Sequence, residues 1–257
     1  MTVTGGWGEG RGWGWDEDEE YGKVFYERAT GGLPEMESSQ AVAKLLAQRI
    51  GEGEVLLDVG CGAGHYLRSL RRLLPARFEY IGVDGAPLYA RLGSEAFAAD
   101  GAARFLAGNA FALPLADGAV DVAMCNNVFL HLPSIAQPLR ELCRVARRAV
   151  VVRTLVGERS FRIQEVRGAG DEFDDDATPR AFNWYNIYSA AYVDHLARSI
   201  DGVRDVRITA DRDFDPERIN ASAAALPGSS NVTTMYGEWQ INGYVLQPWS
   251  FVEIELG

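Results

Sequence analysis

A glycine-rich turn constrains this chain more than any other stretch. An apolar run over residues 55–59 contains Asp58, and Gly60, Gly62 and Gly64 follow at alternate positions. Apolar residues then recur at helical spacing. This pattern predicts a buried strand, a tight turn and a helix. Glycine lets the backbone of such a turn approach a ligand that lies over the start of the helix.

The spacing of these glycines separates the ligand classes that use such a turn. The dinucleotide fingerprint needs a small residue at the sixth position, but counting from Gly60 gives His65, and counting from Gly62 gives Leu67. The P-loop fails as well, because no Gly-Lys-Ser or Gly-Lys-Thr follows. A nucleotide-dependent oxidoreductase is therefore the weakest of the open functions.

A second acid supports a nucleoside site. Asp84 ends the next apolar run, over residues 78–83, twenty residues after Gly64. A carboxylate at the end of the second strand can accept hydrogen bonds from both ribose hydroxyls. Together with Asp58, it indicates a site for an adenosine-type group.

Strands and helices alternate through residues 53–156, which predicts an α/β fold with a doubly wound, mostly parallel sheet. Asn126 and Asn127 end the fourth strand, at the edge where open α/β sheets bind ligands. Near the N-terminus, Ser38 or Ser39 is expected to cap an amphipathic helix, and Ser189 to cap the helix over 190–200.

Three motifs together resemble those of class I S-adenosylmethionine-dependent methyltransferases, in the small-molecule branch that includes ubiquinone-biosynthesis-type enzymes. They are the Asp-x-Gly-x-Gly-x-Gly turn, the second-strand acid, and the fourth-strand stretch that ends in Leu-His-Leu-Pro. The resemblance covers roughly residues 40–210. It implies a Rossmann-like methyltransferase fold with seven strands, the last one antiparallel. It also implies N-terminal helices that cover the cofactor.

The resemblance further implies S-adenosyl-L-methionine as the cofactor and methyl transfer to an oxygen, nitrogen or carbon nucleophile of a small molecule. Arg28 is expected to pair with the methionine carboxylate of the cofactor, and Asn109 stands where the family usually has an acid that contacts adenine. The cofactor-binding residues expected on this basis are Tyr26, Arg28, Asp58, Gly60, Cys61, Gly62, Gly64, Asp84, Gly85, Asn109, Ala110 and Asn126.

The acceptor site is expected to follow the fourth and fifth strands. Asn127, His131, Tyr185 and Tyr188 are the predicted substrate residues. His131 is also the candidate general base, with a packing role as the alternative. Asn109 in place of the usual acid keeps a second function open, that of a non-catalytic cofactor-binding or regulatory protein.

Composition argues against several classes of binding partner. The net charge of −11 and the predicted pI of about 4.8 argue against a nucleic-acid substrate. The three cysteines lack metal or disulfide spacing, which favours a cytoplasmic protein with reduced thiols. The three histidines show no ligand spacing, so no metal site is expected. No signal peptide or membrane-inserting stretch is evident.

The predicted organisation has an N-terminal arm with cofactor-covering helices over residues 1–50 and a methyltransferase domain over 51–257. Insertions that act as lids are expected at about 157–188 and 211–243. Residues 1–20 are rich in Gly, Trp and acids. They form either a disordered leader or an arm that packs over a site or against a second subunit, which leaves a homo-oligomer open.

Overall fold

The computed structural model describes residues 19–166, 173–224, 233–243 and 245–257. Most of the Trp- and Gly-rich arm lies outside these residues. A central sheet runs through the molecule in the order β3-β2-β1-β4-β5-β13-β9, and the short strand β8 also pairs with β5. The strands are β1 (Val55–Val59), β2 (Glu79–Asp84), β3 (Ala103–Ala107), β4 (Val120–Asn126), β5 (Ala146–Gly157), β8 (Tyr188–Ser189), β9 (Val203–Ala210) and β13 (Trp249–Leu256).

The sheet confirms the predicted doubly wound architecture. Strands β1 to β5 pair in parallel, while β13 runs antiparallel to both β5 and β9. The predicted seven strands form the continuous path, and β8 is an addition to it. The last strand of the central sheet, β13, begins only at Trp249. Pro248, which lacks an N–H for the ladder, follows β12 (Val245–Leu246), and that strand pairs in another sheet.

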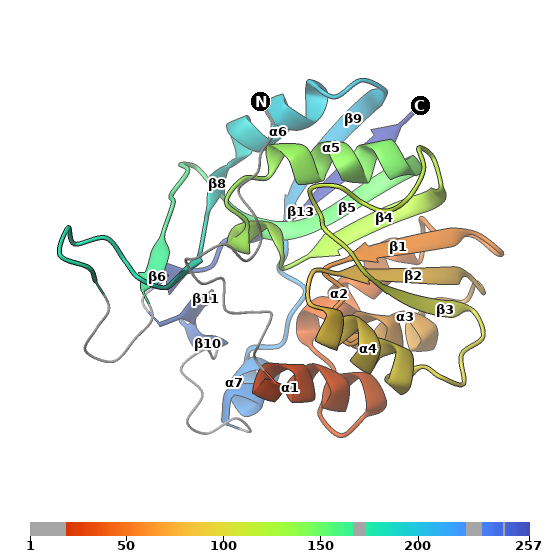
Figure 1. The fold of residues 1–257 in the computed structure, drawn as a ribbon, viewed down its shortest axis with the longest axis horizontal. Coiled ribbons are helices and arrows are strands. Elements are labelled where there is room, and N and C mark those ends of the chain that lie inside the picture. Colours follow the sequence, from red (N-terminus) through yellow and green to blue (C-terminus); the bar gives the residue numbers. More distant parts are fainter. Residues whose placement is uncertain (1–18, 167–172, 225–232, 244) are drawn as a thin grey trace.

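Helices cover both faces of the sheet (Figure 1). One face carries α1 to α4 and the other carries α5 and α6. Alternate residues of β1 show why both faces are apolar: Leu56 packs in the core beneath α2 and α3, and Leu57 in the core beneath α5. The helices are α1 (Glu19–Thr30), α2 (Glu37–Leu46), α3 (His65–Leu73), α4 (Pro87–Ala96), α5 (Ala136–Val145) and α6 (Ala190–Arg198).

The predicted helix caps have different outcomes. Ser189 does cap α6, since its hydroxyl accepts a hydrogen bond from the backbone N–H of Tyr192. The prediction for α2 is wrong, because that helix begins at Glu37 and its N-cap is Met36. Ser39 lies inside the first turn instead, where its hydroxyl donates to the Met36 carbonyl and contacts the hydroxyl of Ser69.

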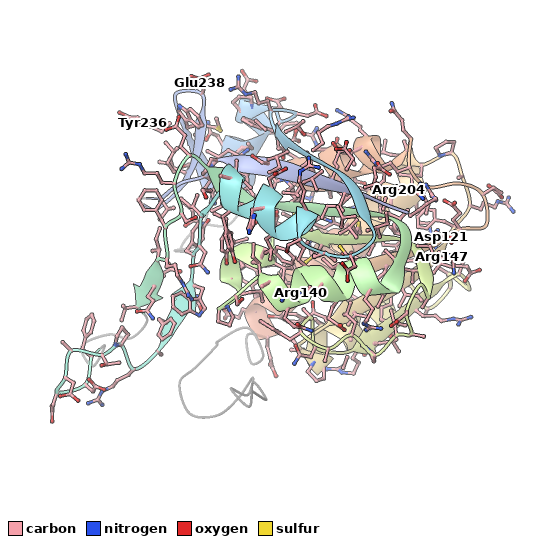
Figure 2. The ribbon with its side chains drawn as sticks, turned by 90° about the horizontal axis from the view of Figure 1, so that it is seen from above. Asp121, Arg140, Arg147, Arg204, Tyr236 and Glu238 are labelled. Carbon is pink, nitrogen blue, oxygen red and sulfur yellow. The ribbon has the colours of Figure 1, made fainter. Side chains whose placement is uncertain are left out.

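Two small sheets stand beside the carboxyl ends of the parallel strands (Figure 1). They are β6 (Gln164–Val166) with β7 (Phe182–Trp184), and β10 (Thr233–Tyr236) with β11 (Trp239–Asn242) and β12, while α7 (Pro216–Ala224) packs on β10. Figure 2 shows Tyr236 and Glu238 at the outer turn between β10 and β11, far from Asp121 and Arg147. Within the described ranges, no helix has the length and apolar character required to span a membrane.

Candidate functional site

The glycine turn lies tightly against its neighbours. The N–H of Gly60 donates to the Val83 carbonyl over 2.7 Å and joins the end of β1 to the end of β2. Its φ is +76°, and an added Cβ would lie 2.2 Å from Cγ2 of Val128. Only glycine therefore fits at this position, and the backbone forms part of the site wall.

A cavity of about 240 Å³ opens at the carboxyl edge of the parallel strands, over this turn. Residues from α1, from the turns after β1, β2 and β4, and from β13 line it. The structure brings ten of the predicted site residues together in its wall: Arg28, Gly60, Gly62, Asp84, Gly85, Ala110, Asn126, Asn127, His131 and Tyr185.

Four other predicted residues lie behind or beside this wall. Asp58 is buried and accepts a hydrogen bond from the Tyr80 hydroxyl over 2.7 Å, and burial raises its pKa to about 7. Cys61 is buried, and burial raises the pKa of its thiol. Gly64 is the N-cap of α3. Tyr26 is half-buried on α1. A cofactor role for these four stays a prediction.

Asn109 and Tyr188 also lie outside the wall. Asn109 is exposed, and its amide oxygen accepts from the N–H of Phe111 over 2.8 Å. This is a local turn that holds the chain after β3. Tyr188 is buried, with its hydroxyl donating to the Phe129 carbonyl over 3.4 Å, and burial raises its pKa to about 12.

Asp84 is held firmly at the edge of the cavity. One carboxylate oxygen accepts from the N–H of Gly62 over 2.8 Å, and the other accepts from the N–H of Ala86 over 2.9 Å. A carboxylate offers about four lone-pair sites, so two backbone donors do not exhaust it. The carboxylate is thus oriented and can still accept hydroxyl hydrogens from a ligand.

Helix α1 supplies one wall of the cavity. Tyr21, Phe25 and Arg28 are spaced so that they share one helix face, and all three line the cavity. Burial lowers the pKa of the Arg28 guanidinium. Among the described residues, no carboxylate forms an ion pair with it. This cation is therefore available to an anionic ligand group.

Asn126 is an unsatisfied polar group in the wall. Its side chain is buried, and within the described part of the chain neither its amide oxygen nor its amide nitrogen has a hydrogen-bond partner. Leaving such a group unpaired costs about 1–3 kcal/mol. A ligand that both accepts and donates at this point would recover that cost.

Asn127, unlike Asn126, has hydrogen-bond partners for its side-chain amide within the protein. Its backbone φ is +60°, and its amide nitrogen donates to the Tyr66 hydroxyl over 3.1 Å. Its amide oxygen accepts from Arg153, which also pairs with the buried Asp211 over 2.6 Å. The Asn127 amide is therefore engaged within the protein, and its predicted substrate contact stays a prediction.

His131 and Tyr185 stand together farther along the cavity. The Nδ1 of His131 lies 2.9 Å from the carbonyl oxygen of Trp184. A carbonyl only accepts, so Nδ1 carries the proton and Nε2 is the basic nitrogen of the neutral ring. The Tyr185 ring meets the His131 ring edge-on, and the Tyr185 hydroxyl accepts from Gln247.

Sequence reasoning missed several wall residues. Tyr21 and Phe25 had a local signal, since both share helical spacing with Arg28. Gln247 and Trp249 had none, because they come from the far end of the chain and reach the cavity only through the position of β13 in the sheet. His65 and Tyr66, at the start of α3, also line the cavity. Across the described residues, no group of three His, Cys, Asp or Glu could hold a metal.

Comparison with known proteins finds similar sequences for the central part of the chain. Residues 57–152 match the family described as "Methyltransferase domain". An uncharacterized methyltransferase of Mycobacterium sp. (strain JLS) is 35% identical over 95 residues, which is 37% of this chain and 35% of the relative. The chain thus matches only about a third of the length of such curated relatives.

Solved structures extend the likeness in fold to nearly the whole chain. A putative sarcosine dimethylglycine methyltransferase from Galdieria sulphuraria has a TM-score of 0.57 at 15% identity, covering 91% of this chain and 98% of that one. A [4+2]-cyclase has a TM-score of 0.55 at 19% identity, covering 84% of this chain and 80% of that one. The sequence match therefore covers residues 57–152, and the solved structures show that the fold of the longer chain is shared.

Proposed function

We propose that this protein transfers the methyl group of S-adenosylmethionine to an oxygen, nitrogen or carbon nucleophile of a small molecule, as a member of the small-molecule branch of its class. One observation carries the proposal. The wall of the cavity over the glycine turn combines an oriented carboxylate, a cation without an acidic partner among the described residues, and an unsatisfied amide. These groups match the ribose hydroxyls of the cofactor, its carboxylate and its polar groups near the transferred methyl.

Each wall group has a proposed task. Asp84 accepts the ribose hydroxyls, Arg28 pairs with the methionine carboxylate, and Asn126 meets polar groups of the cofactor near the transfer point. Gly60, Gly62 and Ala110 let backbone lie against the ligand. When bound, S-adenosylmethionine supplies a methyl group that its positively charged sulfur already activates. The remaining task of the chain is to align donor and acceptor, which can supply on the order of 7–11 kcal/mol.

His131 is the proposed general base for an acceptor that must lose a proton. Its Nε2 is basic because Nδ1 donates to the Trp184 carbonyl, and the ring lines the cavity. A positioned base contributes about 10²–10⁴-fold. We therefore expect His131→Gln to lower kcat within that range while leaving cofactor affinity unchanged. Equal losses in kcat and cofactor affinity would assign His131 to packing.

The segments 157–188 and 211–243 are proposed to act as lids over the acceptor. Tyr185, Thr233 and Asn242 support this, because they come from these segments and line the cavity. The net charge of −11 supports a small molecule rather than a nucleic acid as the acceptor. The free, buried thiols of Cys61, Cys125 and Cys143 support a reducing compartment such as the cytoplasm.

The test combines binding with chemistry. S-Adenosylhomocysteine should bind the wild-type protein, and Asp84→Ala should weaken that binding by about 1–3 kcal/mol, the scale of a stranded polar partner. Asp201→Ala, an exposed acid in a distant turn, is the matched control. Transfer of a labelled methyl group to a small molecule in a cell extract, with the product identified by mass, then tests catalysis.

Two results would point elsewhere. Tight binding of NAD with no binding of S-adenosylhomocysteine would replace the proposal with an oxidoreductase. Cofactor binding with no methyl transfer to any acceptor would favour a non-catalytic or regulatory protein. Methyl transfer itself must be measured, because a protein named as a [4+2]-cyclase shares this fold.

A further inference from the structure

His65 is a wall residue to which neither the motifs nor the proposed function gives a task. It is the first residue of α3, directly after the glycine turn, and it lines the cavity. Its side chain is only 8% exposed, and its Nδ1 is buried without a hydrogen-bond partner among the described residues. A buried polar ring that lines the cavity and has an unpaired nitrogen indicates that a ligand group binds there.

Neighbouring residues fix the orientation of the ring. Phe25 of α1 stacks on it with ring centroids 4.6 Å apart and an angle of 2° between the planes, and Tyr66 meets it edge-on at 5.0 Å. A Cβ on Gly62 would lie 3.2 Å from both Cε1 and Nδ1 of His65. The imidazole edge therefore lies beside the turn backbone, where a ligand over the helix start must pass.

The charge state of the ring defines what it can bind. Burial, and secondly the positive charge of Arg28, lower the pKa of His65 to about 3. The ring is therefore neutral at physiological pH, with one nitrogen that accepts and one that donates. A neutral acceptor beside a cation suits a ligand that carries an anionic and a cationic group on one carbon atom.

We infer that His65 accepts a hydrogen bond from the α-ammonium group of the amino-acid part of the cofactor, while Arg28 pairs with its carboxylate. Both side chains belong to one wall and are near enough to interact electrostatically. The ammonium and carboxylate of an α-amino acid share one carbon atom, so two neighbouring partners can bind both. This inference depends on the proposed function and assigns partners to the amino-acid end of the ligand.

Three probes separate this role from packing: S-adenosylhomocysteine, its deaminated analogue that keeps the carboxylate, and 5′-methylthioadenosine, which lacks the amino-acid part. We expect His65→Phe, which keeps the stack on Phe25, to weaken S-adenosylhomocysteine about tenfold in titration calorimetry. Affinity for the other two probes should not change. His65→Gln, which retains an acceptor, should restore part of the loss. Arg28→Met should weaken both probes that carry the carboxylate.

The outcomes are distinguishable. Unchanged S-adenosylhomocysteine affinity in His65→Phe, or an equal loss for all three probes, would overturn the role of His65 and leave the proposed function standing. Failure of the wild-type protein to bind S-adenosylhomocysteine at all would overturn both. Thermal unfolding of each variant shows whether the fold is intact, and His65→Gln provides the comparison if His65→Phe unfolds.

Discussion

At the scale of single residues, Gly60 sets how closely the chain can approach a ligand. An alanine there must adopt a left-handed φ, which costs about 1–2 kcal/mol, and its Cβ would overlap Val128. Overpacking adds about 1–3 kcal/mol. We therefore expect Gly60→Ala to lower the free energy of urea unfolding by the sum of both effects and to abolish measurable S-adenosylhomocysteine binding.

Gly53 provides the matched control for that substitution. Its φ is +73°, close to that of Gly60, but no atom lies within 4 Å of an added Cβ. Gly53→Ala should therefore show only the cost of the left-handed backbone, and Gly60→Ala combined with Val128→Ala should recover part of the packing loss. Equal costs at Gly53 and Gly60 would mean that the contact with Val128 is unimportant.

The buried carboxyl of Asp58 makes stability depend on pH. Burial raises its pKa from 3.8 to about 7, with a smaller raising effect from Asp84, while the Tyr80 hydroxyl opposes the shift. Between about pH 4 and pH 7 the native state keeps a proton that the unfolded chain has lost. This contribution to stability is therefore full below pH 4 and is lost as pH rises through 7.

Asp58→Asn should remove that dependence, because the amide is neutral and its oxygen can still accept from Tyr80. As the pH rises from about 4 to about 7, the free energy of unfolding of the variant should increase relative to that of the wild type. The increase should be on the order of 1.4 kcal/mol per pH unit at most. Urea unfolding of both proteins at pH 5 and pH 7 measures the difference. Parallel pH curves for the two proteins would contradict the assignment to Asp58.

At the scale of elements, a site residue could be predicted from the sequence when a local pattern placed it at the end of a strand. The glycine turn, the acid of β2 and the asparagines of β4 lie at strand ends, so the parallel order of strands was enough to bring them together. Tyr26 was predicted in the site, but it lies outside the cavity wall, whereas Tyr21, Phe25 and Arg28 form the face that lines it. The direction in which α1 packs decides this, and its contacts with α3 and α4 are long-range.

The end of α1 is held by Arg68 of α3. Its guanidinium donates to the carbonyls of Arg28 and Leu33, over 3.0 and 3.2 Å. Arg68→Met should loosen α1, lower S-adenosylhomocysteine affinity roughly two- to tenfold, and speed proteolysis of the N-terminal segment. Arg68 and Arg72 both pair with Glu35. Arg72 forms no hydrogen bond with α1, so Arg72→Met is the matched control. If Arg72→Met has similar effects, the loss of affinity comes from the broken ion pair with Glu35 and not from the loosened end of α1.

At the scale of the whole molecule, a series of polar contacts reaches the cavity wall and connects distant parts of the sequence. Asp211, after β9, pairs with Arg153 of β5, which donates to Asn127 after β4. Asn127 donates to Tyr66 of α3, and the Tyr66 hydroxyl donates to Ser38 of α2 over 2.8 Å. No sequence pattern predicts this chain of contacts, because each step joins residues that only the completed sheet brings together.

Arg153 is the central member of this chain. It is 3% exposed, and its guanidinium also lies over the Trp249 ring, 4.1 Å from the centroid. Removing one partner of a buried pair leaves an uncompensated charge and costs about 3–5 kcal/mol. Arg153→Met should therefore destabilise the protein by that amount in urea unfolding, and Arg153→Met combined with Asp211→Asn should cost less than the sum of the single changes.

The exposed pair of Arg91 and Glu95 on α4 is the control for this cycle. Its side chains are 62% and 50% exposed, and such pairs contribute about 0–1 kcal/mol. Arg91→Met should therefore change stability little and leave ligand affinity intact. Because Arg153 holds the amide oxygen of Asn127 and with it the turn that follows Asn126, Arg153→Met should also weaken S-adenosylhomocysteine binding. If the stability costs of Arg153→Met and Asp211→Asn are additive and the affinity for S-adenosylhomocysteine is unchanged, the two residues are not coupled and do not support the ligand site.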